Sequence, residues 1–241
     1  RKVHEIPEAG RTAKGTAIVN LLNLQPDEHI ATILSVKTFQ DGKYIVMATK
    51  NGLVKKTQLS AYSKPRASGI AALKIKEGDE LIGVRVTNGG QDIFLSTKTG
   101  KAVRFHEGDL RSMGRVAAGN TGIRLKKGDE VVSVEILNNV AAILTITENG
   151  YGKRTKTEEY RVQKRGGKGA FSIKTSQRNG HVVGAHQVTQ DDELMILSSE
   201  GKIIRIRADG ISVIGRHTQG VKLINLDASE KVVAVARLVE A

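Results

Sequence analysis

Basic side chains recur at one fixed place in this sequence, and their chemistry suits the binding of anions. The sequence has four dipeptides in which a polar residue is followed by glycine, and a Lys or an Arg stands four residues after each of these glycines. In two of the four places, another Lys directly precedes this basic residue. These residues are Lys55, Lys56, Arg104, Lys153, Arg154 and Arg205. An Arg guanidinium forks onto phosphate oxygens, and a Lys supplies a compact positive charge. The series therefore predicts a set of phosphate contacts.

A second basic series lies in loops that are rich in Gly and Ala. Its members are Arg11, Lys14, Lys64, Arg66, Arg115, Arg165 and Arg216. Small residues let backbone amides approach a phosphate closely while an arginine binds its oxygens. These loops are therefore predicted to contact phosphates as well.

The orientation of the first series follows only partly from the pattern. Arg104 and Arg205 have apolar neighbours on both sides, which on an alternating strand turns the two arginines toward solvent. Lys56 and Arg154 have polar neighbours, and the pattern leaves their orientation open. A lone basic residue in a turn is usually just solvated. Basic positions in register with a structural period indicate a binding surface instead.

Other chemistry is sparse, and the motifs of common enzymes are absent. The six histidines are scattered without metal-ligand spacing, and His181 and His186 are interpreted as surface or packing residues. The segment 162–169 lacks the spacing of a P-loop, and no nucleophile elbow or zinc-protease motif occurs. The acidic segments 77–80 and 128–130 recur with the period of the basic residues, which indicates structural turns. We expect no catalytic residue, no metal site and no cofactor in this chain.

Composition favours a polyanionic partner. The 241 residues include 38 Lys and Arg against 25 Asp and Glu, a net charge of +13. Nucleic acid is the first expectation, and an anionic membrane surface or the ribosome is the second. The absence of Cys excludes disulfides and suits a reducing cytosol. The apolar runs are far shorter than the roughly 20 residues of a membrane span, and the first residues do not resemble a signal peptide.

The elements that position the basic residues repeat about every 50 residues. Polar-glycine pairs end at Gly52, Gly100, Gly150 and Gly201, at spacings of 48, 50 and 51 residues. A second anchor, G-x-x-x-(I/V/L)-(N/K/R), starts at Gly15, Gly69, Gly119, Gly169 and Gly220. A short apolar strand follows each copy, the first being HIATILSV at 29–36. Three anchors in one order at one period identify a repeat protein.

The pattern of apolar and turn residues within each repeat predicts four short strands and almost no helix, so the predicted fold class is all-β. Asn51-Gly52 and Asn149-Gly150 are dipeptides typical of two-residue type I′ hairpins. Units of this size pack radially in propeller-like folds, where neighbours bury both faces of each unit. We expect one domain over 1–241, with 1–40 forming the later part of a first blade and about four repeats over 41–241. A radial array would place the basic residues as a belt on its rim, which fits a bent duplex bound without sequence readout.

The segment QKRGGKG at 163–169 resembles the QRRGGKG box of the carboxy-terminal domain of the DNA gyrase A subunit, with Lys164 at its second position. The phrases IPEAGRTAKGTAIVNLL, ATKNGLVKKT, GDELIGV, NGYGKRT and GRHTQGV resemble the same domain, so the resemblance covers nearly the whole chain. It implies a β-pinwheel, usually of six blades, that exchanges strands between neighbours. The family's principal box lies in the first blade, and we expect this chain to begin after it.

The resemblance further implies that duplex DNA wraps the rim, so that ATP-dependent strand passage by the holoenzyme introduces negative supercoils. The box residues implied to contact DNA are Gln163, Lys164, Arg165, Gly166, Gly167, Lys168 and Gly169. The implied partners are the gyrase B subunit and the rest of the A subunit, in an A2B2 holoenzyme. ATP and Mg²⁺ serve other parts of that enzyme, a type II topoisomerase. The implied location is the bacterial cytoplasm at the nucleoid, away from membranes, and the isolated domain is expected to be monomeric.

Three other interpretations remain. The equivalent domain of topoisomerase IV is similar but normally lacks an intact box. A protein-binding propeller scaffold would carry Trp, Tyr and Arg hot spots on one face, whereas this chain has no Trp and its charge follows the rim. A propeller enzyme would need an acid or histidine constellation in its central channel, and the sequence shows none.

Overall fold

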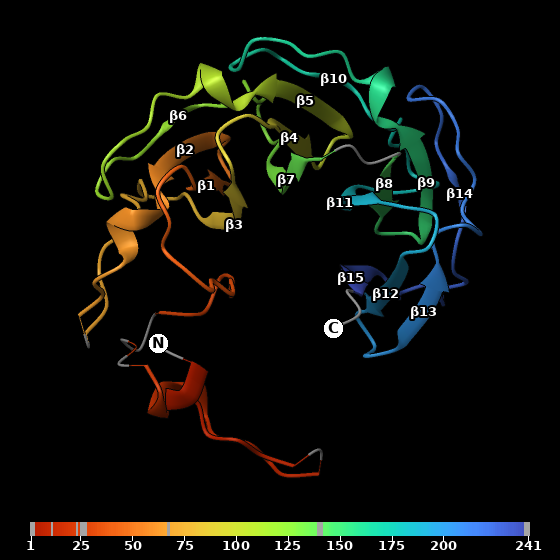
Figure 1. Ribbon diagram of the computed structural model, residues 1–241. Coiled ribbons are helices and arrows are strands. Elements are labelled where there is room, and N and C mark those ends of the chain that lie inside the picture. Colours follow the sequence, from red (N-terminus) through yellow and green to blue (C-terminus); the bar gives the residue numbers. More distant parts are fainter. Residues whose placement is uncertain are drawn as a thin grey trace.

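The protein forms four small antiparallel β-sheets arranged side by side in an arc, seen in a computed structural model (Figure 1). The structure describes residues 3–10, 12–22, 24, 28–66, 68–138 and 142–238. The strands in the first half of the chain are β1 (Tyr44–Thr49), β2 (Leu53–Gln58), β3 (Leu81–Thr87), β4 (Asp92–Thr97), β5 (Lys101–His106), β6 (Asn120–Thr121) and β7 (Val131–Leu137). Those that follow are β8 (Ala142–Thr147), β9 (Tyr151–Lys156), β10 (Ala170–Phe171), β11 (Val182–Val188), β12 (Glu193–Ser198), β13 (Ile203–Arg207), β14 (Val221–Lys222) and β15 (Val232–Leu238).

The first three sheets each take their outermost strand from the following repeat. The strand orders are β3-β1-β2-β6, β7-β4-β5-β10 and β11-β8-β9-β14, and the fourth sheet is β15-β12-β13. The exchanged strands pair through Thr121 with Leu53, Phe171 with Lys101, and Lys222 with Tyr151. Because the exchanged strands β6, β10 and β14 lie on the outside of the arc, β3, β7, β11 and β15 form its inside (Figure 1). The predicted all-β, propeller-like fold with exchanged strands is confirmed.

The hairpin turns differ from the predicted type. A type I′ turn needs positive φ at both central residues, and no non-glycine residue in the described part of the chain has positive φ. The amide of Gly52 donates to the carbonyl of Thr49 at 2.9 Å, and Gly52 alone is left-handed, with φ +83°. A Cβ on Gly52 would also lie 2.8 Å from the carbonyl oxygen of Ile123 in the next repeat. The glycine is therefore required by the turn and by the packing of the next repeat.

Apolar cores fill the spaces between neighbouring sheets. One cluster joins the first two sheets through residues such as Val54, Leu95 and Phe105, and another joins the last two. Between the second and third sheets, Phe94 meets Tyr160 edge to face at 5.0 Å. Burial of each large apolar side chain contributes about 1.5–3 kcal/mol, so the sheets hold together through both of their faces.

Helix is confined to short 3-10 turns, as the sequence predicts for the described residues. The turns are Val3–Glu5, Ile18–Asn20, Leu59–Tyr62, Glu107–Asp109 and Thr157–Glu159. The predicted strand at 29–36 is not formed, and Ile33 there is 83% exposed. A strand needs a hydrogen-bonding partner, and no described residue pairs with this segment.

Candidate nucleic-acid interface

Basic residues four positions after the hairpin glycines tie each of the first three sheets to the next repeat. Lys56 Nζ donates to the carbonyl oxygen of Glu107 at 2.8 Å, at the start of the 3-10 turn in the second repeat. Arg104 Nη1 donates to the carbonyl oxygens of Thr157 and Tyr160 at 3.0 and 3.2 Å, at the matching turn of the third repeat. These side chains therefore point toward a neighbouring repeat.

Of the later members of this series, Arg154 also contacts the next repeat, whereas Arg205 does not. Arg154 donates from Nε to the carbonyl of Ile211 at 2.8 Å and from Nη2 to that of Asp209 at 3.2 Å. Arg205 holds the matching place in the fourth sheet, for which the described residues supply no following repeat. It is exposed and pairs with Glu193 of its own sheet, with its Nε at 2.7 Å.

The predicted solvent exposure of this series is therefore correct only for Arg205. The side chain of Arg104 is 22% exposed, because Asp92 and the next repeat cover it. Lys56 and Arg154 are 7% and 6% exposed. Both use their charge to hold backbone carbonyls inside the protein, so their burial gives no support to the prediction that they contact DNA.

Lys55 and Lys153 are buried as well, at 1% and 0% exposure. Lys153 Nζ donates to the carbonyl of Gly215 at 2.6 Å, and Lys55 Nζ donates to that of Ala72 at 2.6 Å and to that of Arg115. Burial, together with a nearby arginine, lowers the pKa of both ammonium groups from 10.5 to about 8, although Glu159 opposes the shift at Lys153. Their burial gives no support to the prediction that these lysines touch DNA, since both ammonium groups point into the protein.

The box at 163–169 forms a loop on the outside of the second sheet. Gly166 and Gly169 are left-handed, with φ +74° and +69°. The amide of Gln163 donates to the carbonyl of Arg104 at 2.8 Å, and that of Gly166 to the carbonyl of Gly122 at 2.6 Å. Both amides donate to carbonyls of the protein, so neither is available to bind an anion. The glycines at these positions shape the loop.

The basic side chains of the box differ in exposure. Lys164 and Lys168 are exposed, whereas Arg165 is half-buried. Arg165 donates from Nε to the carbonyl of Asp109 at 3.0 Å and from Nη1 to that of Thr121 at 3.1 Å. Among described residues these contacts use two of the five guanidinium donors. Arg165 thus binds the backbone of the exchanged strand β6, while part of its guanidinium group remains accessible to solvent.

Arg216 repeats this arrangement one repeat later. Its Nη1 donates to the carbonyl of Phe171 on β10 at 3.3 Å, and its guanidinium lies 5.8 Å from the ring centre of Tyr160. Arg115 is half-buried at the matching place, and Lys14, Lys64 and Arg66 are exposed. Arg11 lies outside the described residues.

A further basic series was overlooked in the sequence. Lys74, Arg124 and Lys174 occupy the last position of the repeated G-x-x-x-(I/V/L)-(N/K/R) anchor, and all three are exposed. Their amides donate to carbonyls of the loop in the next repeat, for example from Arg124 to Gly167 at 2.8 Å. The signal was present in the anchor itself, which admits Lys or Arg at that position.

The outer rim is the name we give to the loops 112–119, 163–169 and 213–220 together with β6, β10 and β14. These elements follow the convex side of the arc (Figure 1). The exposed or half-buried basic residues on or beside it include Lys64, Arg66, Lys74, Arg115, Arg124, Lys164, Arg165, Lys168, Lys174 and Arg216.

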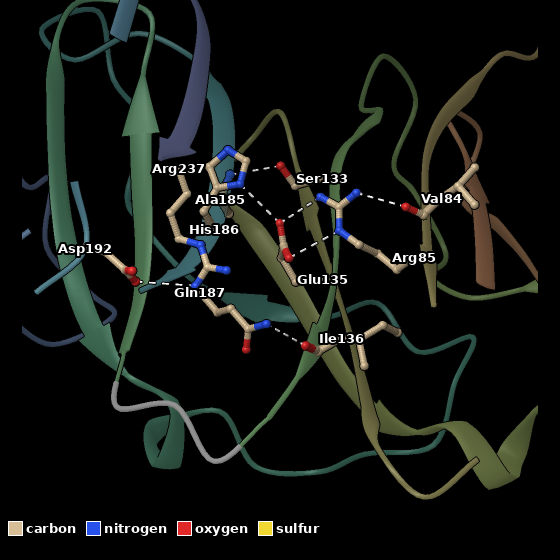
Figure 2. Close-up of polar contacts among 10 residues, drawn as sticks. All are labelled: Val84, Arg85, Ser133, Glu135, Ile136, Ala185, His186, Gln187, Asp192 and Arg237. Atoms are coloured by element: carbon tan, nitrogen blue, oxygen red, sulfur yellow. Dashed lines mark hydrogen bonds and ion pairs between the residues drawn. The ribbon is translucent and has the colours of Figure 1, made fainter. Parts of the chain in front are cut away.

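The inside of the arc has a different charge arrangement (Figure 2). Glu135 on β7 accepts hydrogen bonds from Arg85 Nη2 on β3 at 3.0 Å and pairs with His186 Nδ1 on β11 at 3.1 Å. Burial alone would raise the pKa of Glu135, but hydrogen bonds from His186 and Arg85 outweigh it and hold that pKa below its usual value. The inner side thus carries paired charges such as Arg85 with Glu135, and His186 is a packing and hydrogen-bonding residue.

The acidic turns are structural, as predicted. Asp79 Oδ1 accepts from the amide of Asn51 at 2.9 Å, and Asp129 Oδ1 accepts from that of Thr99 at 3.0 Å. Within the described ranges, no group of three or more His, Cys, Asp or Glu could hold a metal ion. In the same part of the chain, no helix has the length and apolar character to cross a membrane.

Comparison with known proteins gives one consistent family. The model of the family described as DNA gyrase C-terminal domain, beta-propeller matches residues 2–37, 43–88, 91–138, 141–189 and 192–238. The chain is 48% identical over 239 residues to the DNA gyrase A subunit of Salmonella typhimurium and 51% identical over 237 residues to that of Clostridium acetobutylicum. These alignments cover 99% and 98% of this chain but 27% and 29% of the relatives, so the chain spans less than a third of their length.

Two solved structures have the same architecture. The structure of a DNA gyrase A C-terminal domain matches with a TM-score of 0.85 and 28% identity, covering 94% of this chain and 76% of that one. The C-terminal domain of a DNA topoisomerase IV matches with a TM-score of 0.90 and 27% identity, covering 98% and 74%.

Proposed function

The chain belongs to the DNA gyrase C-terminal domain family, and we propose that it binds duplex DNA without regard to base sequence and wraps it along the outer rim. The observation that carries this proposal is the separation of charge. A series of exposed or half-buried basic residues follows the outer rim from repeat to repeat, whereas the inner strands pair theirs, as Arg85 does with Glu135. A phosphate backbone following the convex side would meet positive charge at each repeat.

Phosphate contacts that recur at each repeat along the arc would bend the bound DNA. Smooth bending of 20–30 base pairs by 40–90° costs on the order of 1–6 kcal/mol, so contacts must persist along the arc to offset it. The exchanged strands and the ties made by Arg104 and Arg154 hold successive repeats at fixed separations. The interior basic residues thus supply rigidity, and the rim residues supply contacts.

In the box, the three glycines shape the loop and the exposed Lys164 and Lys168 reach outward. We assign these two lysines and the free edge of Arg165 to the phosphates, with Gln163, Gly166, Gly167 and Gly169 setting the course of the loop. Arg115 and Arg216 serve the neighbouring loops in the same way. Arg205 and Lys14 remain predicted contacts outside the outer rim, and Arg11, which lies outside the described residues, also remains a predicted contact.

Within the whole enzyme, the wrapped segment would be presented to the strand-passage machinery of a type II topoisomerase, which then introduces negative supercoils. That activity needs the gyrase B subunit and the rest of the A subunit, with ATP and Mg²⁺ acting there. In this proposal the present chain takes no catalytic step, holds no cofactor, and works on chromosomal DNA in the cytoplasm.

The equivalent role in topoisomerase IV is the second candidate, since the TM-score to that enzyme's C-terminal domain is 0.90. The near-complete box at 163–169 favours gyrase.

The salt dependence of binding tests the proposal. The ten basic residues named above for the outer rim predict about ten phosphate contacts, hence a slope of log K against log salt of about −9. Affinity should be nearly equal for unrelated duplex sequences. A slope shallower than about −3, or a strong preference for one short site, would contradict the proposal.

A further inference from the structure

The position three residues after each hairpin glycine alternates between a lysine and an apolar residue. Lys55 and Lys153 stand there in the first and third sheets, and Val103 and Ile204 stand there in the second and fourth. The two lysines are 1% and 0% exposed, and Val103 is 0% exposed. The same place in the fold thus accepts either a buried ammonium or a branched apolar side chain.

Lys153 holds a rim loop that belongs to the next repeat. Its Nζ donates to the carbonyl of Gly215 at 2.6 Å and to Thr218 Oγ1 at 3.1 Å, across 62 and 65 residues of sequence. Thr218 Oγ1 in turn donates to the carbonyl of Gly215 at 3.0 Å. Gly215 directly precedes Arg216, so the ammonium fixes the backbone from which that arginine projects.

Lys55 holds the rim loop 112–119 in the same way, two repeats earlier in the chain. Its Nζ donates to the carbonyl oxygen of Arg115, across 60 residues, and to that of Ala72 at 2.6 Å. Tyr62 Oη also donates to the carbonyl of Ala72, at 3.3 Å. The lysine therefore joins the rim loop 112–119 to the chain of its own repeat.

The box loop between these two is held in another way. Val103 occupies the lysine position beneath it and offers no donor. Arg165 fastens the box by its bonds to the carbonyls of Asp109 and Thr121 at 3.0 and 3.1 Å. The loops 112–119 and 213–220 thus have a buried lysine beneath them, whereas the box loop between them has an apolar residue there and is held by its arginine without such a lysine.

We propose that Lys55 and Lys153 are positioning residues for the outer rim, each fixing the loop that presents Arg115 or Arg216 to the DNA backbone. This inference rests on the proposed function. A buried ammonium must satisfy its donors, and backbone carbonyls of the loop provide acceptors that only one loop conformation brings together. Loss of the ammonium would leave a buried carbonyl unpaired and release the loop, without removing any charge from the DNA-facing surface.

The test replaces each lysine with the residue that neighbouring repeats carry, Lys55→Val together with Lys153→Ile, in the full-length protein that contains this chain. The fold already accepts these residues at the matching places, so the variant should fold. We expect the salt slope for a short duplex to change by less than about 1, because no phosphate contact is lost. The linking difference trapped on relaxed plasmid should fall at least twofold, since loosened loops no longer hold DNA in register.

The matched control is Lys164→Ala together with Lys168→Ala, two exposed lysines of the box. This control should reduce the salt slope by about 2, one for each lost phosphate contact. Amide hydrogen exchange gives a second readout without DNA: loops 112–119 and 213–220 should exchange faster in the Lys55→Val, Lys153→Ile variant, and 163–169 should not change. Lys153→Gln keeps a donor near Gly215 and should restore part of the protection.

Two results would overturn the inference while the proposed function stands. One is a salt slope that falls by about 2 in the Val/Ile variant, which would mean that the lysines contact DNA directly. The other is an unchanged linking difference together with unchanged exchange in both loops. If the unsubstituted protein itself traps no linking difference, the proposed function fails and the inference fails with it.

Discussion

Arg104 on β5 reaches the carbonyl oxygen of Tyr160 at 3.2 Å, although 56 residues separate them in the sequence. The same guanidinium pairs with Asp92 on β4 at 2.8 Å through Nε. One side chain therefore links the second sheet to the start of the third repeat. A basic series that the sequence presents as a surface feature proves to be largely a set of ties between repeats.

Replacing Arg104 with Met should destabilise the fold by about 1–3 kcal/mol, because Asp92 and two carbonyls lose a charged donor. Urea denaturation measures the change. The matched control is Arg205→Met, the same position in the fourth sheet, where an exposed ion pair contributes only about 0–1 kcal/mol. Equal losses in both variants would show that Arg104 does not tie the repeats.

Alanine at two glycines of the box should have unequal effects. Both glycines are left-handed, which costs an alanine about 1–2 kcal/mol. A Cβ at Gly166 would lie 3.5 Å from its nearest atom, whereas one at Gly169 would lie 2.8 Å from the carbonyl oxygen of Ala102. Gly169→Ala should therefore lower the free energy of unfolding by clearly more than Gly166→Ala. A reversed order in thermal or urea denaturation would contradict the packing of this loop.

The buried lysines should make stability depend on pH in alkaline solution. Burial lowers the pKa of Lys55 and Lys153 to about 8, against 10.5 when the chain is unfolded. Between these values the unfolded chain binds more protons, so the free energy of unfolding should rise with pH across this window. The groups around them are Arg115 and Tyr62 for Lys55, and Glu159, Arg216 and Tyr160 for Lys153.

The measurement compares the unsubstituted protein with Lys55→Val, Lys153→Ile at pH 7, 8 and 9.5. Burial raises the pKa of both Tyr62 and Tyr160, so neither phenol titrates in this range. The difference in stability between the two proteins should grow in favour of the unsubstituted one as pH rises. A constant difference would mean that the ammonium groups keep their ordinary pKa.

The overlooked series gives a prediction about binding alone. Changing Lys74, Arg124 and Lys174 to Ala should reduce the salt slope by about 3, with a change in stability within about 0.5 kcal/mol, because all three side chains are exposed. The salt titration should use a short duplex, so that bending does not contribute. An unchanged slope would remove this series from the interface.

The repeat, the all-β class and the propeller-like packing could be predicted because their signals are local and periodic. Glycines such as Gly52 and Gly169 mark turns and close approaches that every repeat needs. The turn type was mistaken because Asn51-Gly52 has the composition of one hairpin while Gly52 is constrained from outside by Ile123. That constraint comes from the next repeat and is invisible in the dipeptide.

Side-chain exposure was harder to predict, for a physical reason. Alternation along a strand distinguishes inside from outside only where one face meets solvent, and these sheets are packed on both faces. Lys55 and Lys56 are consecutive residues on β2, so their side chains point to opposite faces of the sheet, yet both side chains are buried. Each has an acceptor in a loop of the next repeat, 60 residues away for Lys55 and 51 for Lys56, so only the assembled arc shows that their charge is used internally.

The most direct test of the central claim is the linking difference trapped on relaxed plasmid. Closed circular DNA is bound by the protein, relaxed by a type I topoisomerase and then freed of protein. Wrapping along the outer rim predicts a linking difference of one sign that grows with the amount of protein bound. Complete binding with no trapped linking difference would show that the rim holds DNA without wrapping it.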